Sequence, residues 1–122
     1  MIQLSAGGTD SPRRFLNIWR CYMVKHVIIW TLKDEYSADE KKKIAAEIKE
    51  GLEGLKGVVP GIVEIKVNTI GLASSNSDLM LDSLFENEDA LKGYSVHPAH
   101  VAVAEGKVRP FVKNRSCFDY EV

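Results

Sequence analysis

The hydrophobic pattern of the chain becomes regular from Val24 onward and predicts a strand followed by an amphipathic helix. Residues Val24 to Leu32 are apolar at nearly every position, which is typical of a central strand covered on both faces. Ser37 and Glu40 have the spacing of a capping box, in which each side chain satisfies a free backbone N–H at a helix start. One apolar stripe at helical spacing follows, made of Ile44, Ile48, Leu52 and Leu55. The glycines at 51, 54 and 57 indicate where this helix frays and ends.

The second half of the chain predicts two further strands and a short helix. Residues 62–70 alternate apolar and polar side chains, and residues 78–85 form the next strand after a Ser-Asn turn. An acidic stretch at 86–89 suits the positive end of a short helix that runs through Tyr94.

A longer helix is expected from Pro98 towards Val112, followed by a closing strand over 115–122. Pro98 suits the first helical position, because its missing N–H costs nothing there, whereas Pro110 should disturb the last turn. The buried stripe of this helix is predicted to consist of Val101, Ala104, Val108 and Phe111. In the closing strand, apolar and polar residues alternate: Phe118, Tyr120 and Val122 with Cys117, Asp119 and Glu121.

The resulting β-α-β-β-α-β order predicts an α+β, ferredoxin-like fold with one antiparallel sheet and both helical segments on a single face. The apolar residues on the opposite face of the first strand would then be wet in a monomer, at about 25 cal/mol for each Å² left exposed. Pairing two sheets face to face removes this exposure, and two-fold dimers are the commonest oligomers. We therefore expect a homodimer whose sheets form a shared α/β barrel.

Residues 1–22 differ from the rest and are expected to be a leader ahead of a barrel domain at 23–122. This segment is polar and glycine-rich at first, and Asp10 or Ser11 could cap a short helix with Pro12 at its first position. Met23 offers a second start. We therefore expect the leader to be an appended arm, an expression remnant or an upstream-start artefact; a targeting segment ranks last because the stretch is short.

Length and charge indicate one globular domain in the cytoplasm. The chain has 122 residues and a net charge of -1, with acids interleaved among its basic residues, so no nucleic-acid partner is expected. No stretch approaches the roughly 20 apolar residues of a membrane span, so no membrane partner is expected. Cys21 and Cys117 suggest neither a disulfide framework nor a metal site, and no glycine-rich cofactor loop occurs. We expect no metal and no cofactor.

The densest group of titratable side chains lies at the start of the longer helix. Tyr94, His97 and His100 surround Pro98, which places His100 in the first helical turn. That position favours a neutral imidazole, available as a base near neutral pH. His26 lies far upstream within the first strand, so all three histidines serve one site or none.

Four segments carry a resemblance to a known family. They are Met23-Val24-Lys25-His26, the helix-ending Lys56-Gly57-Val58-Val59-Pro60-Gly61-Ile62, Tyr94-x-x-His97-Pro98-x-His100 and Phe118-Asp119-Tyr120. Together they resemble the stress-responsive dimeric α/β barrel (Dabb) family over about Met23 to Val122. The resemblance implies a ferredoxin-like dimeric barrel, a scaffold that hosts unrelated functions.

The resemblance also suggests catalytic residues. His26, Tyr94 and His100 are similar in type to the catalytic His, Tyr and His of plant olivetolic acid cyclase, which closes a linear polyketide by aldol condensation without a cofactor. In that scheme His100 is the general base, Tyr94 orients it or binds a developing enolate oxygen, and His26 holds the substrate carbonyl. The residues that shape the cyclase's alkyl pocket have no recognisable counterparts here, so the substrate does not follow.

A plainer interpretation stands beside each assignment. His26 suits a core histidine with one satisfied hydrogen bond, Tyr94 a packed ring, His97 a helix cap, and Trp30 the core or a dimer interface. The favoured hypothesis is a homodimeric barrel of undetermined activity that binds a small apolar carbonyl compound. The alternatives are a cofactor-free cyclase or lyase with His100 as base, and a non-catalytic structural protein of the stress response. An internal pocket reaching His26, Tyr94 and His100 together distinguishes the enzyme from a barrel filled by its own side chains.

Overall fold

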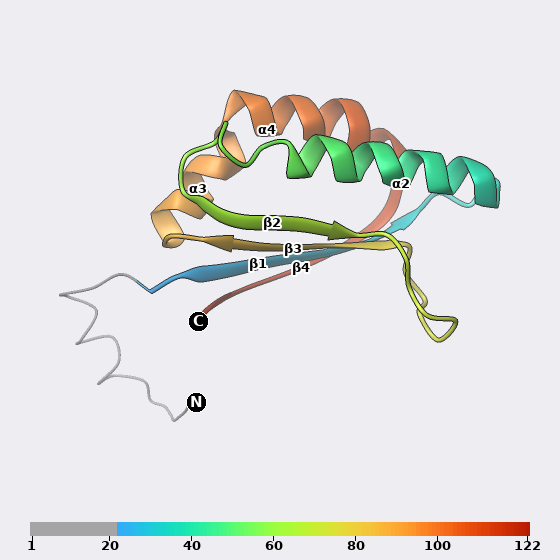
Figure 1. Cartoon of the computed structure of the whole chain (residues 1–122). Coiled ribbons are helices and arrows are strands. Elements are labelled where there is room, and N and C mark those ends of the chain that lie inside the picture. Colours follow the sequence, from blue (N-terminus) through green and yellow to red (C-terminus); the bar gives the residue numbers. More distant parts are fainter. Residues whose placement is uncertain (1–21) are drawn as a thin grey trace.

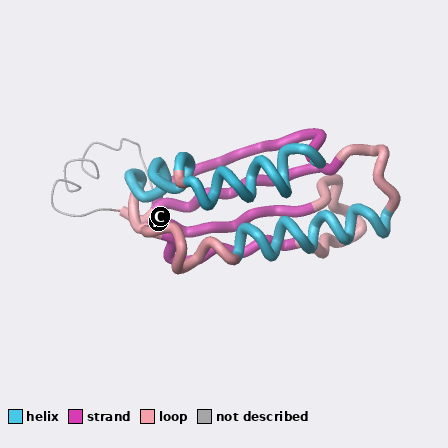
Figure 2. Tube along the Cα trace, turned by 90° about the horizontal axis from the view of Figure 1, so that it is seen from above, coloured by secondary structure: helices cyan, strands magenta, loops and turns pink. Residues whose placement is uncertain are grey.

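The computed structural model describes residues 22–122, which form a four-stranded antiparallel sheet with helices along one face (Figure 1). The strands are β1 (Val24–Leu32), β2 (Ile62–Asn68), β3 (Leu79–Phe85) and β4 (Val112–Glu121), in the spatial order β2-β3-β1-β4. The helices are α2 (Ala38–Glu53), α3 (Glu88–Val96) and α4 (Pro98–Val103). Seen from above, α2 forms one row along the sheet, and α3 and α4 belong to the other (Figure 2). The predicted ferredoxin-like α+β fold is confirmed.

Helix α2 begins and ends as its sequence predicts. The Glu40 N–H donates to Ser37 Oγ at 3.1 Å, and the Ser37 N–H donates to Glu40 Oε1 at 2.7 Å, which completes the capping box. The helix ends at Gly54, whose N–H donates to the Glu50 carbonyl. Its buried residues are Ala45, Ile48 and Leu52, and Leu55 is buried just beyond the helix. This face anchors α2 to the sheet.

His97 separates α3 from α4. Its backbone is extended, and its Nδ1 accepts the Ala99 N–H at 3.1 Å, so it caps α4. Pro98 then occupies the first turn, where it lacks only an N–H that would have no helical partner. The cap expected of His97 is confirmed. Tyr94, near the end of α3, and His100, in the first turn of α4, therefore lie close together.

The helix expected from Pro98 towards Val112 is ordinary α-helix only as far as Val103. A π-helical turn (Ala104–Val108) and a 3-10 turn (Arg109–Phe111) follow, because Pro110 lacks an N–H and its ring crowds the preceding turn. The closing strand accordingly starts at Val112, three residues before the predicted position.

The predicted buried stripe is right for Ala104 and Val108, whereas Val101 is 36% exposed. Val103 takes its place against the core. It packs over Gly51, where an added Cβ would lie only 3.0 Å from a Val103 methyl group. A glycine at this point of α2 therefore allows the two helices to approach closely.

The two faces of the sheet differ in cover. Val24, His26, Ile28, Trp30 and Leu32 of β1 are buried beneath the helices. No described helix or strand covers the other face in Figure 1. Its apolar members are the half-buried Val27, Met80 and Leu84 and the exposed Ile29, Phe118 and Tyr120. Strand β1 thus carries apolar residues on both faces, as predicted.

Two side chains of α2 occupy the outer edge of β2. Glu53 Oε2 accepts the Val67 N–H at 2.9 Å, and Lys49 Nζ donates to the Val67 carbonyl at 2.8 Å. Lys49 and Glu53 also pair with each other at 2.7 Å. Although burial opposes its charge, these hydrogen bonds hold the pKa of Glu53 below its usual value. We call this group the edge clamp.

The expectations for the leader at 1–22, for its short helix and for Cys21 lie outside the described residues. Across residues 22–122, the helices are all too short or too polar to span a bilayer.

Candidate functional site

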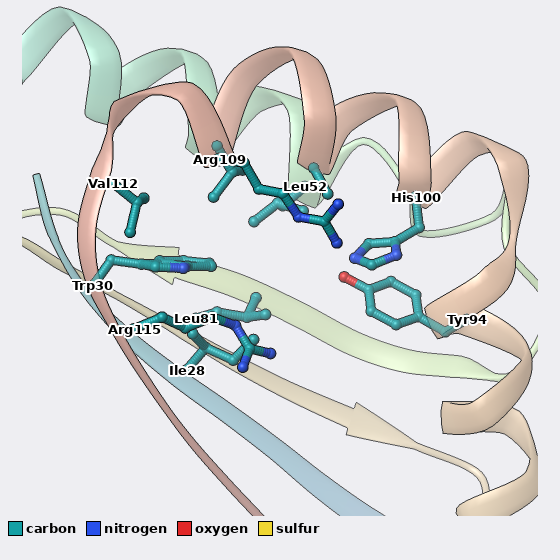
Figure 3. Close-up of a pocket in the computed structure, with 11 residues that line it drawn as sticks. Ile28, Trp30, Leu52, Leu81, Tyr94, His100, Arg109, Val112 and Arg115 are labelled. Carbon is teal, nitrogen blue, oxygen red and sulfur yellow. The ribbon is translucent and has the colours of Figure 1, made fainter.

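A cavity of about 170 Å³ lies between the sheet and the helical segment that follows Pro98 (Figure 3). Apolar side chains from β1, α2 and β3 form much of its wall, namely Ile28, Trp30, Leu52 and Leu81. Tyr94 and His100 close one end, and Arg109 and Arg115 also line it. The volume beside Tyr94 and His100 is therefore a cavity and is not filled by the protein's own side chains.

Tyr94 places a polar group deep in this cavity. The residue is 1% exposed, and its ring packs against Phe85 and His100 at centroid distances of 4.9 and 4.1 Å. Its hydroxyl points into the cavity (Figure 3) and has no hydrogen-bond partner among the described residues. Burial raises the pKa of Tyr94 well above its usual value. The phenol therefore stays protonated and can donate a hydrogen bond.

His100 lies in the first turn of α4, with its ring against Tyr94. Partial burial lowers the pKa of His100, and the electrostatic effects of His26, Arg109 and Arg115 add to this. A contact between its Nδ1 and the Ser95 carbonyl, at 3.4 Å, opposes the shift. The neutral imidazole expected from the helix start is therefore favoured here chiefly by burial, and it can accept a proton near neutral pH.

His26 lies beside Tyr94 and does not line the cavity. It is 7% exposed, and its ring meets the rings of Tyr94 and Phe85 edge-on at 6.0 and 6.1 Å. The structure thus brings Tyr94 and His100 to one cavity. His26 contacts the ring of Tyr94 but does not line this cavity.

Asp119 is a partner of His26 that the sequence did not identify. Strand pairing sets the two residues opposite each other, and His26 Nδ1 lies 2.5 Å from Asp119 Oδ1. The Asp119 carboxylate oxygen accepts the hydrogen bond that His26 donates from Nδ1. An aspartate in a strand does not by itself indicate a histidine partner. The alternation in the closing strand nevertheless predicts that Asp119 lies on the face opposite Phe118 and Tyr120.

Cys117 joins this pair at the surface. Its Sγ lies 3.5 Å from Asp119 Oδ1 and 3.9 Å from His26 Nδ1, and the three ligand atoms lie within 4.8 Å of one another. Nitrogen, sulfur and oxygen donors of this kind can hold a divalent cation such as Zn²⁺. Burial, and then the charge of Asp119, raise the pKa of the Cys117 thiol, so the free thiol is protonated and a poor nucleophile.

The sequence of the barrel domain matches one known family. Residues 24–122 match the sequence pattern of the stress responsive A/B barrel domain, Dabb. The chain belongs to this family. No curated protein sequence matches the chain.

Three solved structures illustrate its relatives. A dimeric protein of unknown function with a ferredoxin-like fold, from Bacteroides fragilis, is 32% identical, with a TM-score of 0.77 over 82% of this chain and 96% of that one. A Dabb family protein from Mesorhizobium loti is 21% identical, with a TM-score of 0.63 over 81% and 95% of the two chains. A hydroxynitrile lyase from Passiflora edulis is 17% identical, with a TM-score of 0.63 over 83% and 94%. The last two likenesses concern the fold alone.

Proposed function

We propose that this Dabb protein is a homodimeric barrel that binds a small, largely apolar carbonyl compound in the cavity at Tyr94 and His100. One observation carries the proposal: the Tyr94 hydroxyl is buried, points into the cavity and has no partner among residues 22–122. Leaving a buried hydroxyl unpaired costs about 1–3 kcal/mol. A ligand carbonyl oxygen would accept its hydrogen bond, while Ile28, Trp30 and Leu81 contact the apolar part of the ligand.

The uncovered sheet face supports the homodimer. Phe118 is 69% exposed and Tyr120 is 42% exposed, and their rings lie 5.7 Å apart on this face. Burying the exposed part of one such aromatic side chain contributes on the order of 2–3 kcal/mol at about 25 cal/mol per Å². The similar Bacteroides fragilis protein is itself described as dimeric.

A second candidate is a cofactor-free cyclase or lyase that uses the same residues. His100, favoured in its neutral form, would take a proton from an acidic C–H next to the ligand carbonyl. Tyr94, protonated and buried, would donate to the enolate oxygen as charge develops there. Because His26 lies beside Tyr94 and not in the cavity wall, we assign it, with Asp119, to positioning the Tyr94 ring. A fold shared with a hydroxynitrile lyase is consistent with this chemistry.

Fluorescence of Trp30 tests the binding proposal. The chain has two tryptophans, so a Trp19→Phe background leaves Trp30, in the cavity wall, as the reporter. We expect saturable quenching by 2,4-octanedione and weaker binding in Tyr94→Phe. Tyr36→Phe makes the same chemical change at a ring that packs on Phe111, outside the cavity wall, and should bind normally.

Proton transfer is tested separately. The acidic C–H groups of 2,4-octanedione exchange with D₂O, and NMR follows the exchange directly. Acceleration by the wild type that is lost in His100→Gln would support the enzyme. Binding without acceleration would leave a ligand-binding barrel, and neither binding nor acceleration with this and related ketones would favour a structural stress protein.

A further inference from the structure

Two arginines line the same cavity as Tyr94 and His100. Arg109 follows the π-helical turn, and Arg115 lies in β4 opposite Trp30. In Figure 3 the Arg109 guanidinium points towards His100, and the Arg115 side chain extends beside Ile28 and Leu81. Both residues are exposed, so they form the mouth of a cavity whose inner wall is apolar.

The residues that the structure describes do not balance the charges at this mouth. Among them, no Asp or Glu lines the cavity. Glu105 pairs with Arg109 at 2.8 Å, whereas no carboxylate of residues 22–122 forms an ion pair with Arg115. One excess positive charge therefore faces the cavity.

We propose, resting on the function proposed above, that the ligand is a monocarboxylate whose carboxylate binds Arg115 and Arg109 and whose apolar body enters the cavity. A guanidinium matches a carboxylate with two parallel N–H donors, and such charge-assisted hydrogen bonds are stronger than neutral ones. A single excess charge suits a monoanion better than a dianionic phosphate. A keto group along the body of the ligand would then lie next to the Tyr94 hydroxyl.

Binding of a carboxylate has a second consequence at His100. Burial and the effects of His26, Arg109 and Arg115 lower the pKa of His100, and an anion between the two arginines and the imidazole offsets part of the arginines' share. A bound carboxylate should therefore raise the pKa of His100, and a neutral ligand of the same shape should not. Titration of the His100 ring signal by NMR measures this difference.

Hexanoate, hexanamide and hexyl phosphate, titrated against Trp30 fluorescence in the Trp19→Phe background, test the proposal. We expect hexanoate to bind at least about tenfold more tightly than hexanamide, since hydrogen bonds to charged groups contribute about 1.5–3 kcal/mol. Arg115→Gln should remove that preference and leave hexanamide binding unchanged. Lys113→Gln removes a positive charge from the same strand, but Lys113 pairs with Asp34 and lies outside the cavity wall, so hexanoate affinity should change less than about twofold.

The following results would contradict the carboxylate proposal. Equal binding of hexanoate and hexanamide, or equal loss in Arg115→Gln and Lys113→Gln, would show that no specific carboxylate site exists. Tighter binding of hexyl phosphate than of hexanoate would assign the arginines to a phosphate. If 2,4-octanedione binds while hexanoate does not, the carboxylate proposal fails and the proposed binding of a carbonyl compound in the cavity stands. If none of these compounds binds, the proposed function fails as well. Melting temperatures of both variants exclude unfolding as the cause.

Discussion

Replacing Tyr94 by phenylalanine removes one oxygen atom from the cavity and leaves the packing of the ring in place. Because the hydroxyl is buried without a partner among residues 22–122, its removal relieves a desolvation cost of about 1–3 kcal/mol, less the small loss of contact where the oxygen was. We expect the free protein to become more stable by about 1 kcal/mol, which is a rise of roughly 4–8 °C in Tm for a domain of this size.

Ligand binding should change in the opposite direction. The hydroxyl donates to the ligand only in the complex, so its loss should weaken 2,4-octanedione binding by about 1 kcal/mol, or roughly fivefold. Urea denaturation and differential scanning calorimetry measure the first effect, and Trp30 fluorescence measures the second. Tyr36→Phe should change stability by less than about 0.5 kcal/mol.

A Tyr94→Phe protein that is less stable than the wild type by 1 kcal/mol or more would refute this reasoning, because the hydroxyl would then have a partner in the free protein. Unchanged ligand affinity would be equally damaging, since Tyr94 would contribute only its ring. The combination of higher stability with weaker binding is the signature of a polar group kept for function.

Three further predictions concern other parts of the molecule. The folded pKa of His100 lies below its unfolded value of 6.5, so its contribution to stability is present above pH 6.5 and is lost as the pH falls through the folded pKa. The free energy of unfolding of His100→Gln, measured over this pH range, should therefore fall less than that of the wild type. An identical pH profile for the two proteins would exclude a depressed pKa. Phe118→Glu should convert the proposed dimer to a monomer in sedimentation velocity at micromolar concentration, and an unaltered dimer would place the interface elsewhere. Gly61→Ala should destabilise the protein by about 1–3 kcal/mol in urea denaturation, because Gly61 has a φ of 89° and a new Cβ would lie 2.5 Å from that of Ala90. In contrast, Gly93→Ala, with nothing within 4 Å in helix α3, should stabilise by about 0.5–1 kcal/mol, and equal effects of the two changes would contradict the strained turn.

Local signals in the sequence were strong enough to predict most elements. The apolar run gave β1 at its observed bounds, and the Ser37–Glu40 capping box fixed the start of α2. The helix after Pro98 was harder, because an α-helical period places Val101 on the buried side. The π-helical turn allows Val103 and Val108, five residues apart, to face the core together.

The candidate site was only partly accessible from the sequence. Tyr94 and His100 are six residues apart, and Pro98 was enough to predict their proximity. The contact of His26 with Asp119 spans 93 residues and depends on strand pairing, which no local pattern specifies. Arg109 and Arg115 looked like ordinary surface charges, since only the folded structure shows that both side chains line one cavity.

The edge clamp of Lys49 and Glu53 on Val67 limits how copies of this chain can associate. An unpaired strand edge is a template for another chain, and at Val67 both peptide groups of β2 are already occupied by side chains from α2. Lateral growth of the sheet is thereby blocked there on one side, while charged residues such as Lys113 and Glu121 discourage it along β4. In the proposed homodimer, self-association uses the sheet face, a contact that two protomers saturate, so the assembly would close instead of extending into a polymer.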